Sequence, residues 1–147
     1  MVVLPPGVKF PLVHTTLTLG PGQSGTVYDL RVPPGWVAFV ERVANVYYED
    51  TWYEFRVDGK QVGGKIDYVL GHINDPLVYD PPILARKQVL WVGHNGGDET
   101  QVFEVLTDGI MFPDVATLSD AERAAKAAVA SLTPEQLEAL KALLRSA

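Results

Sequence analysis

The sequence predicts a mainly β protein: an antiparallel sandwich or barrel with an extended N-terminal arm and a short C-terminal α-helical tail. Turn motifs such as LGPGQSG, VPPG, VDGK, YDPP and HNGGDE recur mostly about 8–15 residues apart, which suits a sandwich or barrel better than alternating strands and helices. The composition changes near residue 113. All 13 glycines and every aromatic residue precede this point, whereas 10 of the 13 alanines follow it. We therefore expect an arm at 1–11, a β domain at 12–112 and two short helices within 113–147.

The arm at residues 1–11 is not expected to fold by itself. Three of its residues are prolines, which block a helix and hinder a central strand because they lack a backbone N–H. Its apolar side chains nevertheless need a surface to cover them. We expect the arm to reach outward and to contact a neighbouring subunit or a partner through Val2, Val3, Leu4 and Phe10.

Runs rich in β-branched and aromatic residues lie between the turn motifs. They predict strands at 12–19, 26–31, 36–48, 52–57, 60–69, 87–93 and 101–107. Asp58-Gly59 is the best local hairpin signal, because both residues tolerate the positive φ that a type I′ turn requires. The run 36–48 is mostly apolar on both of its faces, which predicts a central strand that is covered on both sides. Trp36 and Trp91 are accordingly expected in the core.

Alternation within 52–57 separates a buried face from an outer face. The two sets are Tyr53, Phe55 and Val57 on the buried face, and Trp52, Glu54 and Arg56 on the outer face. A large indole on a polar face is poor for solubility, but it is a favoured anchor at protein interfaces. We therefore predict that Trp52, with Tyr48 on the same face, contacts a subunit or a partner.

The tail contains two helix-start signals. Ser119 and Glu122 form one capping box, and Thr133 and Gln136 form a second, with a proline at the first helical position after Thr133. An apolar stripe follows, made of Leu137, Leu140 and Leu144. A helix of about a dozen residues is marginal alone in water. The stripe is therefore expected to pack on its own β domain or on a neighbouring chain.

Charge and residue usage argue against several classes of function. The net charge is −6 and no basic run occurs, so the electrostatic signature of a nucleic-acid-binding protein is missing. The apolar stretches are too short to span a membrane, and the N-terminus does not resemble a signal peptide. Cysteine is absent, which excludes disulfides, thiolate nucleophiles and cysteine-based zinc sites.

No motif in the chain predicts a reaction. The three histidines, His14, His72 and His94, are far apart and fall in no metal-binding spacing. No nucleophile-elbow motif and no phosphate-binding loop occur. The acidic loops around HNGGDET and between Asp75 and Asp80 suit calcium only weakly and are read as turn chemistry. We expect no catalytic residues, no bound metal and no cofactor.

One pattern of strands and turns covers roughly residues 20–112. LGPGQSGTVYDL leads into VPPGWVAFVERVAN, FRVDGKQV follows as a hairpin, and DPPILARKQVLWVGHNGGDETQVFEVLTDGIMF closes the domain. This order resembles small jelly-roll proteins on virus particles, especially the capsid decoration (cement) proteins of tailed bacteriophages. The resemblance implies a jelly-roll fold and a virion structural protein on the capsid exterior, made in the host cytoplasm, whose partner is the major capsid protein lattice. It also implies a homo-oligomer, with a trimer favoured by the local threefold positions of a capsid. The lack of cysteine and the 11 prolines would suit a thermophilic host.

Two other classes of function remain open from the sequence. The first is a carbohydrate- or receptor-binding β-sandwich module, which would present two or three coplanar aromatic rings on one face. The second is a jelly-roll sugar isomerase or lyase, which would need the clustered histidines that the sequence lacks.

Overall fold

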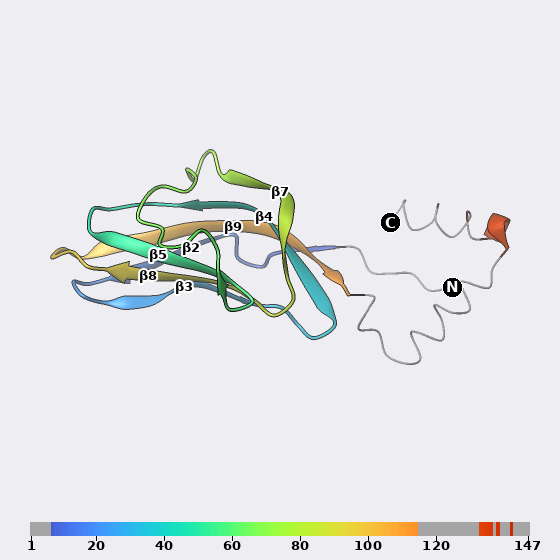
Figure 1. The fold of residues 1–147 in the computed structure, drawn as a ribbon, viewed down its shortest axis with the longest axis horizontal. Coiled ribbons are helices and arrows are strands. Elements are labelled where there is room, and N and C mark those ends of the chain that lie inside the picture. The colour runs from blue at the N-terminus through green and yellow to red at the C-terminus, as the bar shows by residue number, and fades with distance from the viewer. Residues whose placement is uncertain (1–6, 115–132, 137, 139–141, 143–147) are drawn as a thin grey trace.

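Two antiparallel sheets, packed face to face, form the β region of the protein (Figure 1). The computed structural model describes residues 7–114, 133–136, 138 and 142. The first sheet contains β1 (Val8–Lys9), β2 (His14–Leu19), β4 (Trp36–Asn45), β7 (Leu77–Ala85) and β9 (Gln101–Pro113). The second contains β3 (Ser24–Arg31), β5 (Thr51–Val57), β6 (Lys60–Gln61) and β8 (Gln88–Asn95). The mainly β prediction is confirmed.

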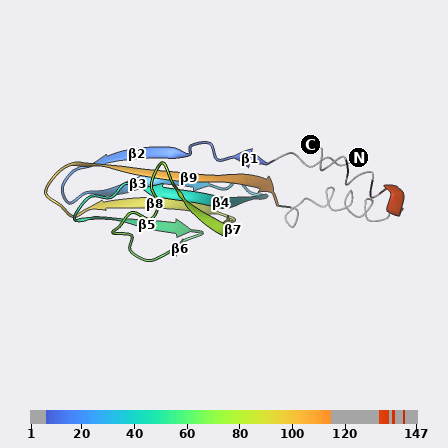
Figure 2. The same ribbon diagram turned by 90° about the horizontal axis from the view of Figure 1, so that it is seen from above.

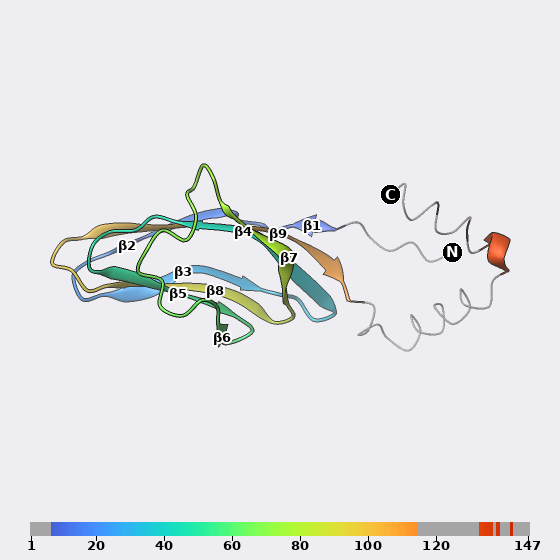
Figure 3. The same ribbon diagram turned by 45° about the horizontal axis from the view of Figure 1, so that its top comes forward.

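The chain crosses repeatedly between the two sheets. In the first sheet, β9 pairs with β4 on one side and with both β1 and β2 on the other, and β4 continues to β7. The second sheet has the order β3-β8-β5-β6. Figure 2 looks down on the first sheet, and Figure 3 shows the long connection from β6 in one sheet to β7 in the other. No helix among the described residues is long and apolar enough to cross a bilayer.

The core lies between the sheets and is built on aromatic rings. On β5, Tyr53 and Phe55 are fully buried, as the alternation of this strand predicts. Phe55 stacks on the buried Trp91 with ring centroids 4.6 Å apart, and Tyr53 meets Phe103 of the opposite sheet at 5.3 Å. Gly93 makes room for Phe103, since a Cβ at this position would lie 2.6 Å from the ring. The prediction of a core position for Trp91 is confirmed, and Trp36 is half-buried against the same core.

A β-bulge interrupts the alternation of the run 36–48, and it adds to the apolar outer face around Phe39 in making both faces look apolar. The register of β4 against both of its neighbours shifts between Val40 and Arg42. Before the shift Val40 belongs to the core, and after it Val43 does. The bulge therefore changes which residues point inward. Beyond residue 41, strict alternation assigns residues to the wrong faces of the strand. The strand is central, as predicted, but it ends at Asn45 instead of residue 48.

Two further strand predictions are corrected. The predicted strand 60–69 consists only of β6 and an isolated bridge between Ile66 and Tyr53, because Gly63 and Gly64 adopt positive φ and interrupt the pairing. The YDPP motif, which was read as a turn, lies inside β7. There the register against β4 jumps from Ile83 to Val78. Proline is tolerated in β7 because this strand forms an edge of its sheet.

The arm prediction is corrected at its inner end. Val8 and Lys9 pair with β9, and Phe10 is only 3% exposed, within the core of its own chain. A Cβ on Gly109 would lie 2.6 Å from the Phe10 ring, so the absence of a side chain there creates the space that this ring fills. Phe10 is therefore not the outward contact that the sequence suggested. Val2, Val3 and Leu4 lie outside the described residues.

The second capping box of the tail is present in the structure. The Thr133 N–H donates to the Gln136 side chain, and the Gln136 N–H donates to the Thr133 hydroxyl, at 3.0 and 3.3 Å. Pro134–Gln136, Glu138 and Ala142 are helical. The first capping box and the residues Leu137, Leu140 and Leu144 lie outside the described residues.

Candidate functional site

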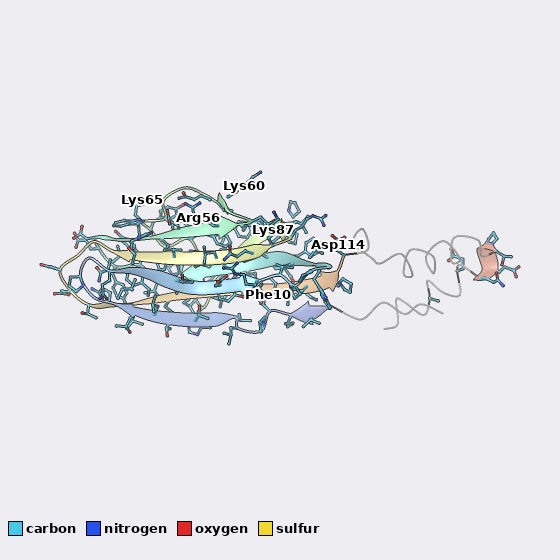
Figure 4. All side chains as sticks on the ribbon, turned by 90° about the horizontal axis from the view of Figure 1, so that it is seen from below. Phe10, Arg56, Lys60, Lys65, Lys87 and Asp114 are labelled. Carbon is cyan, nitrogen blue, oxygen red and sulfur yellow. The ribbon has the colours of Figure 1, made fainter. Side chains whose placement is uncertain are left out.

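The outer face of the second sheet carries an ordered row of side chains from three strands. The strand register places Ser24 of β3, His94 of β8 and Trp52 of β5 opposite one another across the sheet. Glu54 and Arg56 follow on β5 with the same outward orientation, and all three outward residues of β5 are half-exposed. We call Ser24, His94, Trp52, Glu54 and Lys65 the Trp52 cluster. Figure 4 looks onto this face.

Trp52 is held between two neighbours. The His94 ring stacks on it with centroids 5.0 Å apart and an interplanar angle of 16°. The Lys65 ammonium lies 4.6 Å from the centroid of the Trp52 ring, which is a cation–π contact. His94 comes from β8 and Lys65 from the segment after β6, and these elements flank β5 on opposite sides. The indole is therefore fixed from both sides instead of presenting a free ring face.

His94 is itself positioned by two hydrogen bonds. Its Nε2 donates to Glu54 Oε2 at 3.3 Å, because an ionised carboxylate can only accept. In the neutral ring, Nδ1 then accepts from the Ser24 hydroxyl at 2.6 Å. The hydrogen bond from His94 is the main reason that the pKa of Glu54 lies below its ordinary value, and Arg56 lowers it further against the opposing effect of burial. Glu54 therefore stays ionised and keeps the ring in place.

The Ser24–His94–Glu54 chain has the order of a nucleophile, a base and an acid. It does not by itself make a catalytic site, since Ser24 is exposed to water on the open face of a sheet. Acyl transfer also needs preorganised donors for an oxyanion in a site from which water is excluded. We interpret these linked hydrogen bonds as the support that orients the His94 ring against Trp52.

Three exposed lysines lie on or beside this same face. Lys60, Lys65 and Lys87 are exposed, and none of them forms an ion pair with a described residue. Three nearby carboxylates are bound within the sheet, and a fourth, Asp67, is exposed two residues after Lys65. Asp29 pairs with Arg31, Glu54 binds His94 and Arg56, and Asp58 accepts three backbone N–H groups. Figure 4 shows Lys60 and Lys65 near Arg56, with Lys87 toward the end of the face.

The outer face of the first sheet is different in character. An apolar cluster lies there, where β4, β7 and β9 run side by side. It contains Phe39, Leu84, Ile110 and Phe112. Leu84 and Phe112 are 42% and 38% exposed, and the rings of Phe39 and Phe112 meet edge to face at 6.0 Å. The protein thus presents one apolar outer face and one polar outer face that carries both positive and negative side chains.

Trp52 and Tyr48, which the sequence predicts on one face, lie in different kinds of element. Trp52 points outward from β5, as predicted. Tyr48 is half-buried in the connection between β4 and β5 and is not on a strand. Whether either residue binds a partner stays a prediction.

The loop HNGGDET, which suits calcium only weakly, is held by the hydrogen bonds of Asn95. The Asn95 amide donates to the carbonyls of Leu19 and Glu99 and accepts from the Gly97 N–H, so it braces the turn before β9. Within the described part of the chain, no group of three or more His, Asp or Glu residues could hold a metal ion.

Sequence reasoning missed most of the Trp52 cluster. In the sequence, His94 falls in no metal-binding spacing, and no motif indicates a partner for Ser24. Ser24 and His94 are 70 residues apart, and only the pairing of β3 with β8 brings them together. Lys65 follows two glycines with positive φ, which carry it out of the β6 ladder toward Trp52. Neither local spacing nor residue type signalled these contacts.

Comparison with known proteins adds no family to this description: no protein-family model matches the chain, and no curated protein matches its sequence.

Proposed function

We propose that this chain is a virion structural protein that decorates a phage capsid and stabilises its lattice through non-catalytic protein–protein contacts. The observation that carries the proposal is the order of the strands. Taking β2 to β9 as eight successive strands, the orders β2-β9-β4-β7 and β3-β8-β5-β6 support the assignment of a jelly roll. Viral capsid domains are among the proteins built on this fold.

The two outer faces support an adhesive role. One presents apolar side chains that remain partly exposed, and the other presents a fixed tryptophan among unpaired lysines. Exposed apolar patches and aromatic anchors are typical of interaction surfaces. The proposed partner is the major capsid protein lattice on the exterior of the particle, and the proposed form of the protein is a homo-oligomer, with a trimer favoured.

The jelly roll is also used by lectins, so a carbohydrate-binding module is the main alternative. Sugar rings stack on open aromatic faces. Trp52 is the exposed-face tryptophan of the second sheet, and His94 and Lys65 already flank its ring. This arrangement favours a protein contact at the edge of the indole over the stacking of a sugar.

Binding to capsids tests the proposal. The purified chain would be mixed with expanded empty heads of the tailed phage that encodes it, the heads would be pelleted, and the bound copies would be counted. Saturable binding, at a ratio to capsid protein set by the lattice, supports the role. A chain that stays in the supernatant while binding an oligosaccharide would favour the alternative.

A further inference from the structure

We propose that the outer arm of one copy of this chain, residues 1–6, docks through Val2, Val3 and Leu4 on the apolar cluster of a neighbouring copy. The apolar cluster is the set on the outer face of the first sheet that consists of Phe39, Leu84, Ile110 and Phe112. The inference deepens the proposed function and rests on it, because it takes the homo-oligomer and names two surfaces that hold its copies together.

The apolar cluster reaches the edge of the sheet at the point where the outer arm leaves. Leu84 and Phe112 are 42% and 38% exposed. A Cβ on Gly7 would lie 2.6 Å from a side-chain carbon of Ile110 and 2.6 Å from one of Phe112, so both side chains reach across Gly7. Figure 2 shows β1 beside the last part of β9. An exposed patch of apolar side chains marks an interaction site, and the absence of charge within it favours an aliphatic occupant.

The hydrogen-bond ladder between β1 and β9 cannot continue into the outer arm. At its inner end, the Phe10 N–H donates to the Gly109 carbonyl. Hydrogen-bonded pairs of antiparallel strands recur at every second residue, so continuing the register of β1 would pair Pro6 with Pro113. Neither proline has an N–H, so neither hydrogen bond of that pair can form. The ladder therefore cannot hold the outer arm against its own sheet.

The two prolines also oppose a return of the outer arm onto its own cluster. A residue that precedes a proline is restricted to extended conformations, and this applies to both Leu4 and Pro5. A type II turn at Pro6-Gly7 would need positive φ at Gly7. Gly7 does not have positive φ, and it lies in neither a turn nor a bend. Since β1 runs antiparallel to β9, an extended arm leads past the end of β9 and toward another molecule.

A second copy of the chain supplies the matching surface. Each copy has apolar side chains on its outer arm and an exposed apolar cluster at the same end, so one exchanged contact removes both from water. Three residues of an extended arm span about 7 Å, and the row Leu84, Phe39 and Ile110 crosses three strands, or about 10 Å. Val2 lies at most about 18 Å from Gly7 of its own chain. The clusters of the two copies must therefore meet at one shared interface.

Disulfide trapping tests this contact, because the natural chain contains no cysteine. The double variant Leu4→Cys with Leu84→Cys would be oxidised mildly and separated without a reducing agent. We expect covalent dimers and larger species that disappear on reduction. The matched control is Leu4→Cys with Val102→Cys, since Val102 is 44% exposed on the same sheet but lies about 30 Å along β9 from Phe112. The control should form only the few bonds made by random collision or between two arms.

A substitution within the outer arm gives an independent check by sedimentation at several concentrations. Val3→Asp would place an unpaired carboxylate against the apolar cluster, so self-association should weaken about tenfold. Leu12→Asp adds the same charge at a position that is 63% exposed beyond β1. It should associate as the natural chain does. Equal association of the two variants would overturn the proposal.

The trapping experiment has three further outcomes against the proposal. Cross-linked monomers would mean that the outer arm returns to its own cluster. Equal trapping at Leu84 and Val102 would mean that the arm has no preferred site, and trapping at neither would leave the cluster to another occupant, such as the tail. An oligomer without trapping at the cluster would remove this contact and leave the proposed function intact. A trapped arm in a chain that fails to bind heads would remove the capsid role and leave this contact intact.

Discussion

Asp58 joins the β5–β6 turn to the β7–β8 turn through a single side chain. It occupies the left-handed region at φ 53°, as the Asp-Gly hairpin signal predicts, and Gly59 follows at φ 80°. Its carboxylate accepts the N–H groups of Arg86, Lys87 and Gln88 at 2.9, 2.7 and 3.0 Å. Burial alone would raise the pKa of Asp58. The three N–H donors and the charge of Lys87 outweigh burial, so the pKa lies below its ordinary value of 3.8.

This arrangement predicts an acid-sensitive contribution to stability. Asp58→Asn keeps the shape and the tolerance of positive φ but removes the charge, so it should cost about 1–2 kcal/mol at pH 7. A carboxylate with a depressed pKa stabilises the fold above its unfolded pKa, near 4, and loses that contribution as the pH falls through the folded value. Urea unfolding of both proteins at pH 7 and near pH 2 should show a difference that shrinks in acid. A difference independent of pH would mean that the charge of Asp58 is irrelevant to folding.

Phe55 and Trp52 lie on opposite faces of one strand and allow a matched comparison. Phe55 is fully buried and stacks on Trp91, so Phe55→Ala should cost about 3–5 kcal/mol of unfolding free energy. Trp52 is half-exposed, and replacing it removes mainly the stack with His94. Trp52→Ala should therefore cost about 1 kcal/mol of unfolding free energy. Denaturant melts measure both values. If the two variants were equally unstable, Trp52 would be acting as a core residue and not as a surface anchor.

At the scale of elements, the predictable strands are those whose alternation is uninterrupted. The run 52–57 keeps a period of two, and its buried and outer residues were identified from the sequence. The strand β7 was missed, because its Pro81-Pro82 pair looks like a turn, and only its position at a sheet edge makes the prolines acceptable. In β4, the bulge near Glu41 changes the inward set, which a strict period cannot anticipate.

The candidate site was likewise predictable only where it depends on alternation within a single strand. Trp52 follows from local alternation alone. The residues that hold Trp52 in place are brought to it by the register of β3, β8 and β5. That register is set by long-range packing and leaves no short motif in the sequence.

The long connection between β6 and β7 depends on one buried amide. Asn45 is 1% exposed, and its side chain donates to the Tyr68 carbonyl at 2.9 Å and accepts from the Leu70 N–H at 2.7 Å. Asn45→Ala leaves both backbone groups unpaired and should cost about 1–3 kcal/mol. Amide exchange at Leu70 should accelerate in this variant. Asn74→Ala, an exposed change in the same connection, is the control and should leave that exchange unaltered.

At the scale of the whole molecule, the strands form a unit that closes on itself. Its first and last strands, β1 and β9, pair with each other. At the end of this unit, the Asp114 N–H donates to the Gly35 carbonyl, and its carboxylate pairs with Arg86. The ring contacts of the core all join residues within β5, β8 and β9. The sandwich therefore has its own core and its own closing contacts before the tail begins.

Because these contacts complete the sandwich, we predict that the tail is needed for assembly but not for folding. A chain ending at residue 115 keeps every contact of Asp114 described above, so it should retain its near-UV spectrum and melt cooperatively. The apolar stripe Leu137, Leu140 and Leu144, which the sequence places on the tail, needs a surface to cover it. Sedimentation at several concentrations should therefore give the full chain a larger assembly, a trimer under the proposed function, and the shortened chain a smaller one. A shortened chain that no longer melts cooperatively would assign the tail to the core. A shortened chain that assembles as the full chain does would leave the stripe without a part in association.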